Sequence, residues 1–123
     1  MERIVDLDLA AARIAVLVPG WRAAGPAVSG PTWRDAAASW PAPLLTDRAL
    51  AADPDSVGLV VEDPRTGSVL QAVLFRGGWA DVEGLLVHGE RDAEVVVFPA
   101  NGITGEADFA ARLSGWAAEV FRL

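Results

Sequence analysis

Four short apolar segments follow one another between Ser56 and Phe98, and each join between them is only three to five residues long. The segments read SVGLVVE, SVLQAVLF, WADVEGLLV and AEVVVF, and the joins read DPRTG, RGG and HGERD. A parallel connection needs a crossover of about a dozen residues or more, so joins this short restrict neighbouring strands to antiparallel pairing. The sequence therefore predicts a four-stranded antiparallel meander over about residues 56–98.

The third segment shows the alternation of a strand with one buried face. One side, which we expect to be polar, carries Trp79, Asp81, Glu83, Leu85 and Val87. The other side, which we expect to face the core, carries Ala80, Val82, Gly84 and Leu86. The second and fourth segments are nearly continuous in apolar residues, a pattern typical of strands that are central in a sheet or covered on both faces.

Helical signals flank the meander. Asp6 or Asp8 offers an N-cap for a helix over Leu9–Val18, which Pro19-Gly20 should end. A second helix is expected over residues 106–121, because apolar side chains recur there at spacings of three and four. The members of that stripe are Phe109, Leu113, Trp116 and Val120.

The region between the first helix and the meander carries mixed signals. Residues 19–31 are rich in Pro and Gly and predict an irregular connection. Thr32 and Asp35 form a capping box, which predicts a short helix through Ser39 with Trp33 and Trp40 on one face. No repeat or long linker divides the chain. We therefore expect one α+β domain over residues 1–123, with the four-stranded meander packed against an N-terminal and a C-terminal helix.

Composition excludes several classes of function. The chain has no Cys, which excludes disulfides, thiol catalysis and thiolate metal ligands. Its net charge of −7 opposes binding to nucleic-acid phosphates, and no apolar run is long enough to span a bilayer. No basic region followed by an apolar run opens the chain, so we expect a cytoplasmic protein without membrane contact. All basic residues are Arg, a bias typical of the GC-rich coding of actinobacteria.

The third segment gathers residues that favour binding of a protein partner. Asp81 and Glu83 lie two apart on one strand, so both carboxylates face the same side. They form a solvated polar face, recognise Arg on a basic protein, or bind a metal or do acid–base work, and we favour the first two. Trp79 and Trp21 stand beside Gly or Pro, where a ring can stay partly exposed, and exposed Trp near Arg is typical of interface hot spots. His88, the one His, ends the segment in a predicted turn. We predict a partner-binding site formed by Trp21, Trp79, Asp81, Glu83 and His88.

No catalytic, cofactor or metal motif accompanies these residues. His88 has no Cys or activated Ser beside it to act as a nucleophile. Asp53-Pro54-Asp55 matches only half of a calcium loop and is interpreted as a turn. Residues 101–105 precede a helix, where anions can bind, but lack the lysine and the glycine spacing of nucleotide sites. The sequence predicts no cofactor, no metal site and no catalytic residue.

The C-terminal third, AEVVVFPANGITGEADFAARLSGWAAEV, resembles the end of actinobacterial immunity proteins of polymorphic toxin systems. Those chains similarly close with strands, a Phe-Pro exit such as Phe98-Pro99, a short loop and an amphipathic last helix. The resemblance implies a small acidic protein that binds and blocks a cognate toxin. It assigns no functional residue to this sequence, because no site motif is shared.

These observations favour a non-catalytic, acidic protein-binding module, such as an immunity protein, a chaperone or an adaptor, whose partner is a basic toxin or another secreted protein. Two alternatives stay open. A small-molecule-binding protein or small enzyme would hold a pocket between the sheet and the helices, lined by Trp79, Asp81, Glu83 and His88. A homo-oligomeric structural subunit, such as a homodimer, would pair through an edge strand or a helix face.

Overall fold

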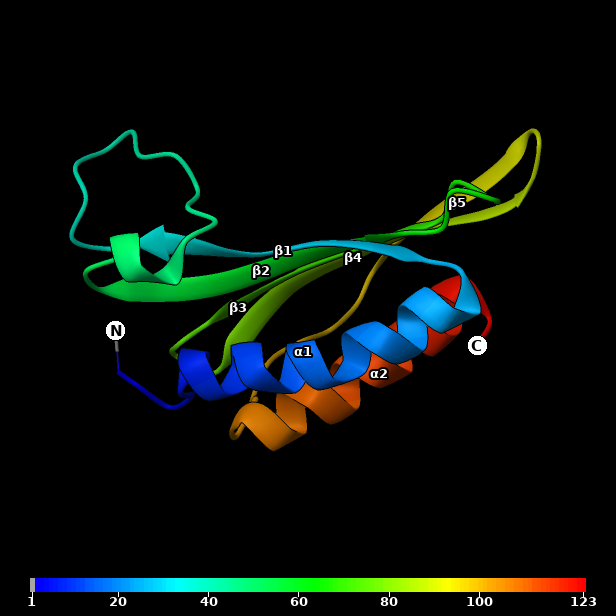
Figure 1. The fold of residues 1–123 in the computed structure, drawn as a ribbon. Coiled ribbons are helices and arrows are strands. Elements are labelled where there is room, and N and C mark those ends of the chain that lie inside the picture. Colours follow the sequence, from blue (N-terminus) through cyan, green and yellow to red (C-terminus); the bar gives the residue numbers. More distant parts are fainter. Residues whose placement is uncertain (1) are drawn as a thin grey trace.

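Five strands form one antiparallel sheet, and two helices pack side by side against one of its faces (Figure 1). The structure is a computed structural model that describes residues 2–123. In chain order the elements are α1 (Leu7–Ala24), β1 (Ala27–Asp35), the short 3-10 helix η1 (Arg48–Leu50), β2 (Pro54–Glu62), β3 (Val69–Phe75), β4 (Trp79–Gly89), β5 (Asp92–Val97) and α2 (Glu106–Phe121). The strands lie in the order β1-β2-β3-β4-β5, so the α+β class and the meander topology are confirmed.

The meander has one strand more than the sequence predicts. The four predicted strands are β2 to β5, and each pairs antiparallel with the next. The additional strand, β1, comes from residues for which the sequence predicts a connection and a short helix. In β1, Trp33 pairs with Val57 and its ring is buried. The carboxylate of Asp35 accepts hydrogen bonds from three N–H groups of the following loop, those of Ala37, Ala52 and Asp53. The predicted helix is therefore wrong, because strand pairing buries Trp33 and the loop occupies the Asp35 carboxylate.

Helix α1 begins at its predicted cap and ends later than predicted. The Asp6 carboxylate accepts hydrogen bonds from the N–H groups of Asp8 and Leu9, at 2.9 and 3.1 Å. The helix continues through Pro19, whose missing N–H costs one hydrogen bond on an exposed side of the helix. It ends at Gly25, where φ is 122° and a side chain would be strained.

The inner face, defined as the side of the sheet that points at the helices, carries the hydrophobic core. Leu59 of β2, Leu70 of β3 and Val82 of β4 are buried there, and for Val82 the alternation in the sequence predicts this position. The apolar stripe of α2 lies against this face, and all four of its predicted members are buried. On β4 the helix comes close to the backbone: a Cβ on Gly84 would lie 2.8 Å from Cγ2 of Val120. This glycine therefore permits the contact between the sheet and α2.

The outer face, defined as the opposite side of the sheet, has no helix over it in residues 2–123 (Figure 1). β3 lies in the middle of the sheet, as its apolar sequence predicts. β5 has an equally apolar sequence but lies at an edge, which contradicts the predicted central or covered position. Neither helix in the described part of the chain is long and apolar enough to cross a membrane.

Candidate functional site

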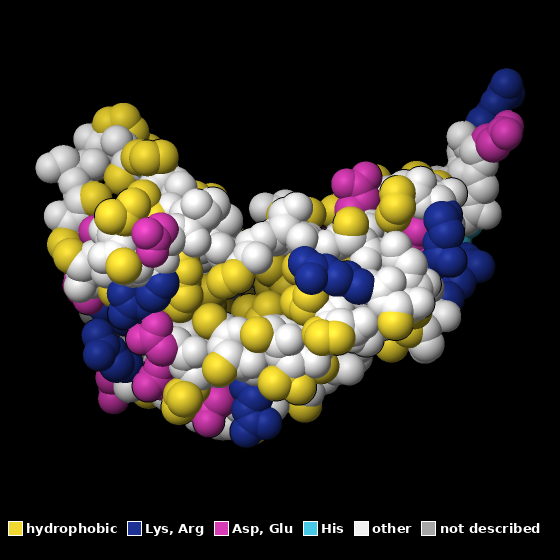
Figure 2. Space-filling view, viewed as in Figure 1, with side chains coloured by type: hydrophobic (Ala, Val, Ile, Leu, Met, Phe, Trp, Pro, Cys, Tyr) yellow, Lys and Arg dark blue, Asp and Glu magenta, His cyan; other side chains and the backbone are white. Residues whose placement is uncertain are grey.

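The outer face is the surface on which the predicted partner-binding residues of β4 lie. Strand register places Val73 of β3 opposite Asp81, and Gln71 opposite Glu83, which in turn faces Val97 of β5. In the edge-on view of Figure 2 this face runs along the top of the molecule, where the surface is hollowed between the loop before η1 and the β4–β5 hairpin. A shallow, open hollow of about 420 Å³ lies over this part of the sheet.

An aromatic stack stands at one end of the outer face. Phe75 and Trp79 are paired across the β3–β4 hairpin, and their rings stack 4.0 Å apart at an angle of 11°. Phe75 is buried, whereas Trp79 remains 38% exposed. The Arg34 guanidinium lies 5.6 Å from the centre of the Phe75 ring. The stack holds Trp79 in one orientation while leaving part of its ring accessible to a partner.

The two carboxylates of β4 are exposed and free of ion pairs. Asp81 and Glu83 both point outward, and among residues 2–123 neither has a basic atom within 4.0 Å. The nearby cation on this side of the sheet is Arg34, which is already bound by the buried carboxylate of Asp55. Its Nε lies 2.9 Å from Asp55 Oδ1, and the hydrogen bonds that Arg34 donates to this carboxylate raise the pKa of Arg34. The negative charge of Asp81 and Glu83 is therefore not compensated by an ion pair within residues 2–123.

Exposed valines adjoin the carboxylates on β5. Val95 and Val97 are 70% and 69% exposed and point to the outer face, where they pair with Leu85 and Glu83. The outer face thus combines unpaired carboxylates, an oriented Trp ring and exposed apolar side chains. Protein interfaces combine the same elements, namely aromatic anchors, apolar contacts and a few charged groups.

Two of the five predicted site residues lie elsewhere. His88 is nine positions after Trp79, an odd separation, so strand alternation directs it to the inner face. There its Nδ1 lies 2.5 Å from Nη2 of Arg122 and its Nε2 lies 3.5 Å from Glu94. Trp21 is buried because α1 runs past Pro19 and turns this ring toward the core. The site therefore keeps Trp79, Asp81 and Glu83 and excludes His88 and Trp21.

Phe75 and Arg34 are the site residues that sequence reasoning missed. Phe75 could have been found from the short RGG join, because a three-residue hairpin places the residues on either side of it opposite one another. No sequence signal indicates Arg34, since its position depends on β1 being a strand paired with β2.

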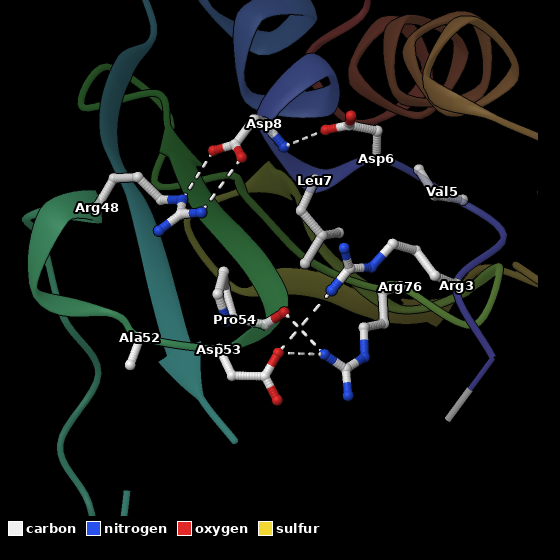
Figure 3. A pocket seen from close by; sticks show the side chains of 10 residues that line it. All are labelled: Arg3, Val5, Asp6, Leu7, Asp8, Arg48, Ala52, Asp53, Pro54 and Arg76. Atoms are coloured by element: carbon white, nitrogen blue, oxygen red, sulfur yellow. Dashed lines mark hydrogen bonds and ion pairs between the residues drawn. The ribbon is translucent and has the colours of Figure 1, made fainter. Parts of the chain in front are cut away.

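A second hollow, of about 230 Å³, lies at the N-terminal end of α1 and is lined by charged side chains that form ion pairs with one another (Figure 3). Arg76 Nη1 lies 2.7 Å from Asp53 Oδ1, which also lies 3.9 Å from Arg3. Arg48 binds the Asp8 carboxylate through two nitrogens, at 2.7 and 3.2 Å. The predicted turn at Asp53 is thus part of an ion-pair network that joins the N-terminal segment to the loop before β2.

Among residues 2–123, no group of three or more His, Asp or Glu side chains is placed to hold a metal ion. Comparison of the chain with protein-family models, with curated proteins and with solved structures finds no match.

Proposed function

We propose that this chain is a non-catalytic protein-binding module that presents its outer sheet face to a basic partner. The observation that carries the proposal is the pair of unpaired carboxylates, Asp81 and Glu83, beside the partly exposed Trp79. A partner Arg would give these carboxylates the hydrogen-bonded ion pairs that they lack among residues 2–123. The net charge of −7 would raise the rate of encounter with a positively charged surface.

The aromatic stack supports the same proposal. Because Phe75 holds the Trp79 ring in place, binding would cost little of the conformational entropy that a free side chain loses. Trp is enriched among the residues that dominate binding energy, and their truncation costs about 2 kcal/mol or more. Trp79 is the residue we expect to act as the anchor, with the carboxylates selecting the charge of the partner.

The kind of partner follows from the resemblance of the C-terminal third to immunity proteins. An immunity protein that covers the basic surface of a cognate toxin is the particular case that we propose. A cytoplasmic site of action and an actinobacterial origin belong to the same proposal. A chaperone or adaptor for a basic secreted protein would use the same face.

The alternative of a pocket between the sheet and the helices has less support. Its proposed lining does not come together, because His88 lies on the inner face while Trp79, Asp81 and Glu83 lie on the outer face. The space between sheet and helices is occupied by buried side chains such as Leu70, and the hollow on the outer face is open and shallow.

Affinity capture from the native host with matched variants tests the proposal. The tagged wild-type chain should recover a basic protein in a stoichiometric amount. Reversal of both carboxylates, Asp81→Arg with Glu83→Arg, should abolish the capture, and Trp79→Ala should weaken binding by about thirtyfold, the equivalent of about 2 kcal/mol. The control reverses two exposed carboxylates away from the outer face, Glu2→Arg with Glu119→Arg, and should bind like the wild type.

Two outcomes would count against the outer face. The first is the absence of any stoichiometric partner over several growth conditions. The second is a partner that the Asp81→Arg, Glu83→Arg variant retains while the control loses it. The second outcome would indicate that the partner binds near Glu2 and Glu119, on the side of the molecule that carries the helices.

A further inference from the structure

The two edges of the sheet differ in how they are protected. At the β1 edge, Trp33 exchanges two backbone hydrogen bonds with Leu45, at 2.7 and 2.8 Å, and the register shifts between Ser29 and Thr32. Register shifts and covering segments are ordinary means by which an edge avoids pairing with another chain. β5 has neither Pro nor a register shift between Ala93 and Val97, and no described segment pairs with its outer side. β5 is therefore the open edge.

The free backbone groups of β5 can be identified from its pairing with β4. Antiparallel residues alternate between those that exchange hydrogen bonds with the neighbour and those that point away from it. The N–H of Phe98 donates to the carbonyl of Val82 at 3.0 Å, and the register pairs Val96 with Gly84 two residues earlier. The backbone groups of Ala93, Val95 and Val97 consequently point to the open edge.

The apolar side chains of β5 resemble those of a strand in the middle of a sheet. Val95, Val96 and Val97 follow one another, and the first and last of them are exposed on the outer face. Exposed edges are usually interrupted by charge or proline. The charged residues of β5 are Asp92, at its first position, and Glu94, whose carboxylate lies 3.5 Å from His88 Nε2 on the preceding strand.

We infer that β5 pairs with β5 of a second copy of this chain, antiparallel, about a twofold axis at Val95. In this register Val95 faces Val95 of the second copy, Ala93 faces Val97 of the second copy, and Val97 faces Ala93 of the second copy. These three pairs bring together the free backbone groups of both edges and form about six hydrogen bonds. Glu94 faces Val96 of the second copy, so no two like charges stand directly opposite.

The charge pattern adds a dependence on ionic strength. The two Glu94 carboxylates are diagonal neighbours in the pairing, and each copy has a net charge of −7. Their repulsion is long-range and is screened by salt. The dimer should therefore strengthen as salt is added, whereas the binding of a basic partner to the outer face should weaken.

Cysteine crosslinking tests both the pairing and its register, because the chain has no Cys of its own. Cα atoms of hydrogen-bonded antiparallel residues lie about 5.5 Å apart, within the range that a disulfide spans. Under mild oxidation, Val95→Cys should give a covalent species of twice the 12.9 kDa monomer. Ala93→Cys should give no covalent dimer, because its counterpart would be about 13 Å away along the strand. Failure of Val95→Cys to crosslink, or equal crosslinking at both positions, would overturn the inference.

Light scattering on the unmodified chain provides an independent test. The mass should rise with concentration from 12.9 kDa toward twice that value, and more readily at high salt. Val95→Pro removes a free edge N–H and leaves the β4–β5 hydrogen bonds in place, so it should keep the chain monomeric and folded. Val95→Thr keeps the N–H and a branched side chain and should still dimerise. A wild-type chain that remains monomeric at all concentrations would contradict the pairing, whatever the fold of the Val95→Pro variant.

Discussion

Replacement of Trp33 by Ala should destabilise the chain far more than the same replacement of Trp40. The Trp33 ring is 3% exposed, and the Arg48 guanidinium lies 5.2 Å from its centre. Arg48 in turn binds Asp8 of α1, so the ring joins β1, the loop and the first helix. Removal of a buried Trp costs about 3–5 kcal/mol, a large part of the roughly 5–15 kcal/mol that a domain has in total. Trp40 is 89% exposed, and its loss should cost less than about 0.5 kcal/mol.

Urea denaturation measures the difference. With a slope of about 2 kcal/mol per molar urea, a loss of 4 kcal/mol lowers the unfolding midpoint by about 2 M, whereas Trp40→Ala should leave it unchanged. Trp33→Phe serves as the intermediate variant, because it retains an aromatic ring for Arg48 and should lose less than Trp33→Ala. A helix over residues 32–39 would place both Trp rings on one face and give them similar costs. Equal midpoint shifts for the two Ala variants would therefore refute the strand assignment.

Two further predictions concern the packing of α2 and the loop after β1. Gly84→Ala should lower the free energy of unfolding by about 1–3 kcal/mol, because its Cβ would lie 2.8 Å from Val120. Gly115 lies on α2 with open space around it, so Gly115→Ala should raise the free energy of unfolding by about 0.5–1 kcal/mol. Urea midpoints that move in the same direction for the two variants would contradict this prediction. Hydrogen bonds from the N–H groups of Asp53, Ala37 and Ala52 lower the pKa of Asp35 below its ordinary 3.8. The stabilisation that these hydrogen bonds contribute is therefore complete above pH 3.8 and is lost as the pH falls through the lowered pKa. Asp35→Asn should lower the melting temperature at pH 7 and reduce its fall below pH 4, and an unchanged acid dependence would exclude Asp35 as a contributor.

The parts of the fold that the sequence predicted correctly are those with local signals. The joins DPRTG and RGG are too short for anything but hairpins, and the stripe from Phe109 to Val120 has only one helical interpretation. Alternation along β4 correctly separated Ala80 and Val82 from Trp79 and Asp81. Each of these inferences depended on residues close together in the chain.

The parts that were missed depend on distant partners. The capping box at Thr32 is a valid local signal, but pairing of Trp33 with Val57, which is 24 positions later, outweighs it. The prediction of an exposed Trp21 failed because α1 continues past Pro19 and its last turn packs on the core. Local residue types indicated where a helix could begin or end, but burial against residues distant in the sequence determined the observed elements.

Three of the five residues predicted for the site lie together on the outer face and two do not, for a similar reason. Closeness in sequence grouped Trp79, Asp81, Glu83 and His88, but only an even separation along a strand keeps two side chains on one face. Asp81 and Glu83 satisfy that condition relative to Trp79, and His88 does not. The sequence predicted a turn at His88, but β4 continues through it to Gly89, so the alternation could be applied to His88 only once the end of the strand was known.

The outer face, which we propose binds a partner, and the open edge are neighbouring surfaces that can be tested separately. Pairing at β5 would join the outer faces of two copies into one surface, on which Trp79 and Asp81 recur on both sides of the twofold axis. A partner with two basic patches would then gain affinity from simultaneous contact, without any change at either site. Reversal of Asp81 and Glu83 should leave crosslinking at Val95→Cys intact. Ala93→Pro, which removes a free edge N–H and spares the exposed valines of the outer face, should abolish the dimer and leave one binding face per chain. If variants that cannot dimerise also lost all binding to a single basic patch, the partner-binding surface would have to span the twofold axis of the dimer. Dimerisation and partner binding would then be one property of the chain.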